Sequence, residues 1–183
     1  MSGSASLGNS SPKWIAVGLL GGLPTTALAV FIIFSSVCPC ERTPGGYLFG
    51  ETVDTPVIDW NFANEVQLCQ LQIYAGIRPH SINLNCMSTP EGELFLSCSF
   101  CNTKYWAARV ENDEPAVLRL NDKLYPVKLN RVQEPATMDQ SWLARVTKLR
   151  SFGTDPYTNN DPSSDQFTER ADHWWTFRVE SRS

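Results

Sequence analysis

The fold of this chain is decided by residues 81–132, which read SINLNCMSTPEGELFLSCSFCNTKYWAARVENDEPAVLRLNDKLYPVKLNRV. Two runs in this stretch, 81–86 (SINLNC) and 94–99 (LFLSCS), alternate apolar and polar side chains. A period of two residues is the pattern of half-buried β-strands. The turn residues Pro90-Glu91-Gly92 separate the two runs, so we expect them to pair as a hairpin.

A second hairpin and a short helix are predicted in the remainder of the stretch. Residues 117–120 and 124–132 read as strands on either side of the turn sequence Asn121-Asp122-Lys123. Between the two hairpins, Asn102-Thr103 offers helix N-cap residues, and Pro115 prevents a helix from continuing. We therefore expect a short helix that opens at Lys104.

This order of elements resembles the core of the split β-barrel in pyridoxamine-phosphate oxidase-like flavoproteins and their deazaflavin-dependent relatives. The resemblance extends over about residues 66–132, with support from WWTFRVE near the C-terminus. It implies a mainly β (α+β) fold, a split β-barrel of the FMN-binding type. The residues that carry it are LFLSCS, Lys104 at the start of the helix, Asn112 and Pro115 at its end, and AVLRLNDKLYPVKLNRV after it.

Other segments supply the rest of the expected barrel. Residues 66–74 alternate as a first strand, and residues 174–179 as a closing strand. Pro135 is expected to begin a helix in which Thr137 and Gln140 form a capping box. The polar residues 151–166 read as a long loop.

The N-terminal part of the chain predicts a membrane anchor. Residues 1–13 are small and polar, so we expect a disordered tail. The uncharged run 14–37 exceeds the roughly 20 apolar residues that cross a bilayer as a helix. A cleaved signal peptide is the alternative, although its apolar region spans only about 7–15 residues. We expect residues 14–37 to be transmembrane, residues 38–60 to be a linker rich in glycine and proline, and residues 61–183 to form the barrel.

The orientation of the anchor depends on few charges. Lys13 precedes the apolar run and Arg42 follows it, and the free amino terminus tips the balance towards an N-terminus inside the cell. We therefore expect a single-pass cell membrane protein whose domain is extracytoplasmic, that is, periplasmic.

Composition indicates which partners to expect. A formal net charge of −4 offers no broad basic face, so nucleic acid is not an expected partner. Beyond the bilayer itself, a glycine-rich helix face at Gly21-Gly22 could pack on another membrane subunit. The six Trp suit a partner-binding surface or the core of the barrel. A homodimer is also left open.

The candidate cofactor site surrounds the predicted helix start. A helix N-terminus presents free N–H groups and partial positive charge, which suits a phosphate. The resemblance places a basic, hydroxyl-rich segment here, and Lys104 matches it. Flavoproteins of this kind usually supply further Arg or Lys from the preceding strand, where this chain has Asn83 and Asn85. We expect FMN or a deazaflavin to contact Asn83, Asn85, Ser97, Ser99, Asn102, Thr103 and Lys104.

Four domain cysteines leave several chemistries open. Cys98 and Cys101 have the CxxC spacing of redox-active pairs, but the βαβ surround of a thioredoxin is missing. Together with Cys69 and Cys86 they could bind zinc, although no histidine is near in sequence. Buried free thiols and disulfides remain the alternatives, and an exported domain favours disulfides.

Two function classes follow. One is a membrane-anchored, flavin- or deazaflavin-binding oxidoreductase-like protein, in which the cofactor carries the electrons. The other is a cofactor-free split barrel that acts as an accessory or docking subunit of a membrane complex. His80 and His173 have no hydrolase spacing, so a catalytic triad is not expected, but His80 lies where it could touch a ligand.

Overall fold

The computed structural model describes residues 24–33, 35, 37, 39, 43–76, 78–110, 112–153 and 169–182. The chain divides into two compact units, Met1–Phe34 and Ser35–Ser183. The second unit carries the barrel. The predicted tail (1–13), and the predicted loop (151–166) from residue 154 onward, lie outside the described residues.

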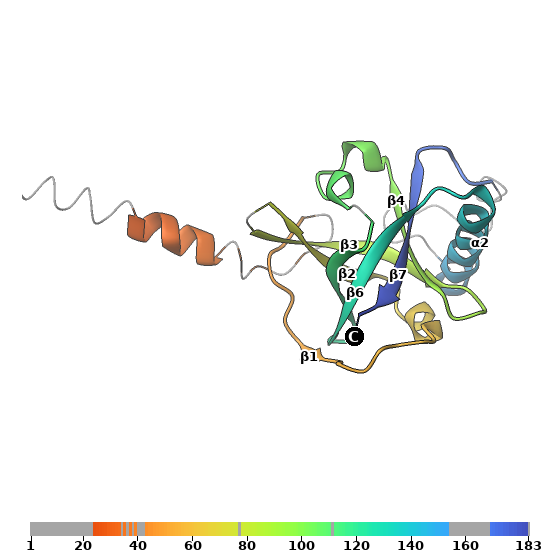
Figure 1. The fold of residues 1–183 in the computed structure, drawn as a ribbon, viewed down its shortest axis with the longest axis horizontal. Helices are drawn as coiled ribbons and strands as arrows, with labels where there is room; N and C mark the ends of the chain where they lie inside the picture. The colour runs from red at the N-terminus through yellow and green to blue at the C-terminus, as the bar shows by residue number, and fades with distance from the viewer. Residues whose placement is uncertain are drawn as a thin grey trace, which may run out of the picture. The chain divides into compact units, whose positions relative to one another are not determined.

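The barrel is a closed sheet of six strands (Figure 1). The strands pair in the order β6-β5-β2-β3-β4-β7, and β7 returns to pair with β6. A two-residue strand, β1 (Glu51–Thr52), pairs with β6 in parallel. The predicted mainly β barrel is therefore confirmed. The barrel strands are β2 (Cys69–Ala75), β3 (Arg78–Ser88), β4 (Leu94–Ser99), β5 (Glu114–Leu120), β6 (Lys123–Val132) and β7 (Trp174–Ser181).

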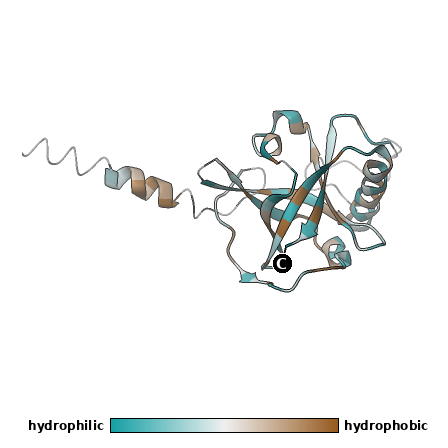
Figure 2. Cartoon of the chain, in the orientation of Figure 1, coloured by the Kyte–Doolittle hydropathy of each residue, from teal (hydrophilic) through white to brown (hydrophobic). Residues whose placement is uncertain are grey.

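Strand alternation fills the barrel with apolar side chains. Figure 2 shows hydrophobic and hydrophilic residues interleaved along the strands. On the inner face, Leu71, Leu96 and Leu118 are fully buried. Burial of one such side chain stabilises the fold by about 1.5–3 kcal/mol, so the inner face fixes the register of every strand.

Both predicted hairpin turns are present. Asn121 and Asp122 have φ of 47° and 64°, and two consecutive left-handed residues form the type I′ turn that suits the twist of paired strands. Gly92 has φ of 85°, and a Cβ there would lie 2.9 Å from the carboxylate of Asp59. Glycine is thus required at this position for both conformation and space.

One helix, α2 (Pro135–Phe152), covers part of the outer face of the barrel, where it contacts β3. It begins as predicted at Pro135, but the predicted capping box is wrong. The carboxylate of Glu134 accepts hydrogen bonds from the N–H groups of Ala136 (2.9 Å) and Thr137 (2.6 Å). The side chain of Gln140 donates instead to Glu91 in the β3–β4 turn.

The predicted linker does not stand free of the barrel in its described part. The backbones of Gly45 and Ser81 exchange two hydrogen bonds, and Leu48 N–H donates to Gln72 Oε1 at 2.7 Å. Leu48 and Trp60 are buried. Glycine and proline suggested a linker, but the apolar residues between them pack on the barrel, and the unit boundary lies at Ser35 instead.

The expected Trp-rich surface is also absent from the described residues. Trp60, Trp106 and Trp142 are buried, and Trp174 and Trp175 are half-buried. The alternative, that tryptophan fills and covers the barrel, holds for these five residues.

Residues 24–33 of the first unit form a helix. Its C-terminal half is hydrophobic (Figure 2), and side chains such as Phe31 and Ile33 are exposed. None of the helices among the described residues combines the length and the apolar character needed to span a bilayer. The predicted anchor, 14–37, lies partly outside the described residues and stays a prediction.

Candidate functional site

The segment after β4 differs from the predicted helix. It consists of two short 3₁₀ turns, Cys101–Thr103 and Ala107–Arg109. Phe100 before them is left-handed (φ 50°), and Lys104 ends the first turn rather than opening a helix. The predicted helix N-terminus is therefore wrong, and the array of N–H groups expected from it is missing. We call residues 100–110 the site turn.

The predicted residues on the site turn are exposed. Asn102, Thr103 and Lys104 all face solvent. The hydroxyl of Thr103 donates to Phe100 O at 2.7 Å, so its proton is already engaged within the turn. Lys104 thus remains the predicted residue with a charge that suits an anion.

The other predicted residues share the outer face of the barrel. Asn85 and Ser97 are direct partners across β3 and β4, and both are buried. Ser97 Oγ has no hydrogen-bond partner among the described residues. By alternation, Asn83 and Ser99 are the next outward residues on the same two strands. These four side chains form a polar patch of amides and hydroxyls, which we call the outer polar patch.

A further group of residues gathers at the end of the barrel where β3 begins. The ring of His80 lies 5.6 Å from the ring of Tyr105, and the guanidinium carbon of Arg109 lies 3.5 Å from the centre of that Tyr105 ring. Arg109 also donates to the carbonyl oxygen of Tyr105 at 2.6 Å. Arg78 is two residues before His80 on β3, so both lie on one side of the strand. We call these four residues the mouth cluster.

Charge and burial act together on His80. Burial lowers the pKa of its imidazole, and the nearby charges of Arg78 and Arg109 lower it further. Two guanidinium groups close enough to do this create a positive potential around a neutral histidine. Lys104 immediately precedes Tyr105 and adds a cation to the same turn. The mouth cluster can therefore attract an oxyanion, which guanidinium groups bind well.

Sequence reasoning singled out Lys104 and His80 but missed Arg78 and Arg109 as site residues. The structure also places His80 and the predicted asparagines Asn83 and Asn85 on opposite sides of β3. His80 lies on the same side of β3 as the core residue Leu84, whereas Asn83 and Asn85 alternate with them. The two groups are connected through β4, which runs from Ser97 and Ser99 directly into the site turn.

The four domain cysteines comprise one disulfide and two free thiols. Cys98 and Cys101 form a disulfide, with both residues buried, and it closes the start of the site turn. Cys69 and Cys86 are free and buried. No group of three or more metal-ligating side chains occurs among the described residues, so zinc has no ligand set there.

The free thiols lie beside a buried lysine. Lys148 Nζ donates to Ala63 O at 2.8 Å and lies 3.8 Å from Cys86 Sγ. Burial raises the pKa of Cys69. Burial would also raise the pKa of Cys86, but the thiol of Cys69 and the ammonium of Lys148 lower it overall. This arrangement offsets the cost of a buried cation and ties α2 to β3.

Comparison with known proteins gives similarity of fold. No protein-family model and no curated protein matches the chain. Among solved structures, a conserved hypothetical protein from Mycobacterium tuberculosis is 16% identical, over 73% of this chain and 86% of that chain, with a TM-score of 0.47. The heme storage protein HutZ from Vibrio cholerae is 14% identical, over 67% of this chain and 86% of that chain, with a TM-score of 0.42.

A proposed pyridoxamine 5′-phosphate oxidase from Corynebacterium glutamicum is 8% identical, over 70% of this chain and 87% of that chain, with a TM-score of 0.35. Similarities at this level assign no residue a role. The strand order and the closure of β6 on β7 are observed in this chain itself. In its fold, the chain is therefore a closed six-stranded β-barrel, as its own strand pairing shows.

Proposed function

We propose that the domain binds a flavin-type cofactor, FMN or a deazaflavin, and acts as a membrane-anchored oxidoreductase-like protein. The observation that carries this proposal is the mouth cluster, in which Arg109 stacks on Tyr105 beside His80. Cofactors of this type carry a phosphate group. A phosphate needs cations and hydrogen-bond donors, and the site turn offers both through Lys104 and Arg109.

The residues present fit such a cofactor in two parts. Lys104 and Arg109 would hold the anionic end. The outer polar patch would hold the uncharged polar edge of the ring, because amides and hydroxyls pair with neutral donors and acceptors. The unpartnered hydroxyl of Ser97 supports this assignment. When bound, the cofactor supplies the electron transfer, and the protein binds and orients it.

A cofactor titration tests the anion site. The full chain, purified in detergent, is titrated with FMN and with a deazaflavin by cofactor fluorescence. Loss of a hydrogen bond to a charged group costs about 1.5–3 kcal/mol, so Lys104→Ala and Arg109→Gln should each weaken binding by about 10- to 150-fold. Lys123→Ala removes an exposed cation from the first residue of β6 and is the matched control. It should bind like the unaltered chain.

The outcomes separate the two function classes. Equal affinity in the unaltered chain and in both site variants would reject the site turn as the phosphate site. If neither cofactor binds to the unaltered chain, the proposal fails. The chain would then be interpreted as a cofactor-free accessory or docking subunit of a membrane complex, with the exposed site turn as a candidate contact surface.

A further inference from the structure

We propose that one edge of the barrel rests on the lipid headgroup surface of the membrane that anchors the chain. This edge consists of Tyr47, Phe49, Tyr74 and Arg78, and we call it the membrane-facing edge. The inference rests on the membrane anchoring in the proposed function, and it adds which part of the domain the lipid covers.

Aromatic side chains on this edge point away from the barrel. Tyr47 is 39% exposed and Phe49 is 57% exposed, whereas Leu48 between them is 6% exposed and packs inward. This alternation holds the segment on the barrel by Leu48 and presents both rings outward. Tyr74, near the tip of the β2–β3 hairpin, is 55% exposed. Large apolar rings exposed together indicate a contact surface.

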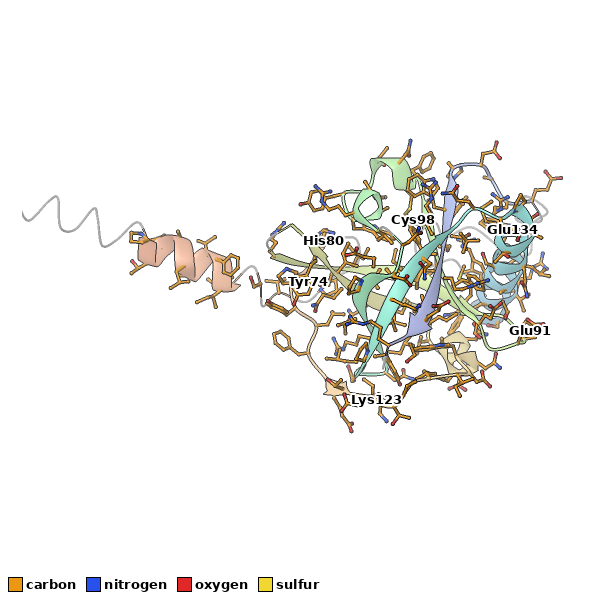
Figure 3. The ribbon with its side chains drawn as sticks, in the orientation of Figure 1. Tyr74, His80, Glu91, Cys98, Lys123 and Glu134 are labelled. Atoms are coloured by element: carbon orange, nitrogen blue, oxygen red, sulfur yellow. A yellow bond between two sulfur atoms is a disulfide. The ribbon has the colours of Figure 1, made fainter. Side chains whose placement is uncertain are left out.

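The two segments of the edge touch each other. The pKa of Tyr74 is raised by partial burial and by the neighbouring Tyr47, through its charge and a side-chain hydrogen bond. Arg78 pairs with Ala75 across the same hairpin. Figure 3 shows Tyr74 and His80 at one end of the barrel, away from Glu91 in the β3–β4 turn. Tyr47, Tyr74 and Arg78 therefore lie at one end of the domain, and Phe49 projects from the same side of its segment as Tyr47.

Chain connectivity identifies lipid as the partner. Tyr47 N–H donates to Ser35 O and Gly46 N–H donates to Val37 O, both at 2.8 Å. Ser35 and Val37 are the last part of the apolar run 14–37. Ser35 follows Ile33 by two residues and is itself helical, and the helix of residues 24–33 before it exposes apolar side chains. The membrane-facing edge is thus hydrogen-bonded to the chain at the point where the apolar run ends.

The side chains suit the interface between lipid and water. Tyrosine is enriched there because its ring is apolar and its hydroxyl can reach water or headgroups. Arginine can extend its guanidinium to lipid phosphates. An edge that combines tyrosine, phenylalanine and arginine at the end of an apolar run has the composition of a membrane-contacting surface.

Photocrosslinking tests the proposal on the full chain. Benzoylphenylalanine replaces Phe49 in one variant and Ile58 in the control, and each chain is reconstituted into phosphatidylcholine vesicles. Ile58 is 92% exposed and apolar but lies elsewhere. Trp60, two residues later, donates to Gly92 O beyond the far end of β3 from Arg78. The eleven residues of β3 span about 35 Å at a rise of about 3.4 Å per residue.

Mass spectrometry of the irradiated samples gives the readout. We expect lipid adducts at position 49 to exceed those at position 58 by at least about tenfold. Equal yields at the two positions, or none at position 49, would overturn the proposal. A carbonate wash tests the anchor separately: release of the chain together with adducts at position 49 would reject the anchor but support lipid contact, and release without adducts would reject both.

Discussion

Ser97 on β4 and Ser141 on α2 are both buried serines, but they differ in their hydrogen bonding. Its Oγ has no partner among the described residues, whereas Ser141 Oγ donates to Met138 O at 3.1 Å and lies 3.2 Å from Thr176 Oγ1. An unpaired buried hydroxyl costs stability, and a paired one contributes to it. Ser97 is therefore the position suited to a ligand, whereas the hydroxyl of Ser141 stabilises the fold.

Substitution of these two serines should have opposite effects. In the cofactor-free chain, Ser97→Ala is expected to raise the free energy of unfolding by about 1 kcal/mol, because it removes an unpaired polar group. Ser141→Ala is expected to lower it by about 1 kcal/mol. Urea unfolding followed by tryptophan fluorescence measures both. A loss of stability in Ser97→Ala equal to that in Ser141→Ala would show that Ser97 already has a structural partner.

His80 should make the stability of the domain depend on pH. Its pKa is lowered in the folded state, so the unfolded state binds more protons between the two pKa values. This stability is present above the unfolded pKa of about 6.5 and is lost as the pH falls through the folded pKa. Melting temperatures from about pH 7.5 to 5 should therefore fall less steeply in His80→Gln than in the unaltered chain.

A second variant tests the cause of that dependence. Arg109→Gln removes one of the two charges that lower the pKa of His80, so its slope should lie between those of the unaltered chain and His80→Gln. If all three chains lost stability in parallel, His80 would not be the group responsible.

At the scale of elements, the C-terminal end of α2 depends on the left-handed backbone conformation of Gly153. Gly153 is left-handed with φ of 76°, its N–H donates to Arg150 O at 3.2 Å, and none of the described residues lies near enough to contact an added Cβ. Gly153→Ala should therefore lower the free energy of unfolding by about 1 kcal/mol through backbone strain alone. Gly153→Asn should lower it less, since asparagine tolerates this conformation. Equal losses in the two variants, measured by urea unfolding, would point to a cause other than strain.

The strands could be predicted because their signal is local. The alternation in LFLSCS predicts β4, and Asn121-Asp122 predicts the turn between β5 and β6. The site turn was predicted wrongly because its conformation depends on contacts outside the segment. Trp106 is buried against Phe177, with 5.2 Å between the centres of their rings. The disulfide holds Cys101 close to Cys98. The N-cap residues Asn102-Thr103 and the later Pro115 suggested a helix, but these contacts produce two short turns instead.

The mouth cluster could not be predicted from spacing. Arg78 begins β3, Arg109 ends the second 3₁₀ turn of the site turn, and no sequence motif relates these two residues from different elements. Their proximity to His80 follows from the return of the chain after β4 to the end of the barrel where β3 begins. Lys104 could be predicted because the family resemblance pointed to it. Arg78 and Arg109 were missed because no resemblance or motif pointed to them.

At the scale of the whole molecule, the barrel begins earlier in the chain than predicted. Residues 43–60 belong to the barrel unit through the bridge from Gly45 to Ser81 and through buried Trp60. Residues 43–60 therefore do not form a free linker. Without a free linker in this part of the chain, the proposed anchor would hold the proposed membrane-facing edge close to the lipid.

The proposed cofactor would contact both the outer polar patch and the site turn. The outer polar patch offers hydrogen bonds to a ring, the site turn offers cations to a phosphate, and β4 connects the two. The cofactor-free alternative uses the same barrel without these contacts. A single measurement on the intact protein distinguishes the two accounts.

That measurement is the visible absorbance spectrum of the full chain, purified in detergent and then incubated with FMN or with a deazaflavin and desalted. Our account predicts a flavin or deazaflavin band that stays with the protein and is much weaker in a chain carrying both Lys104→Ala and Arg109→Gln. A colourless protein that retains neither cofactor after desalting would contradict it.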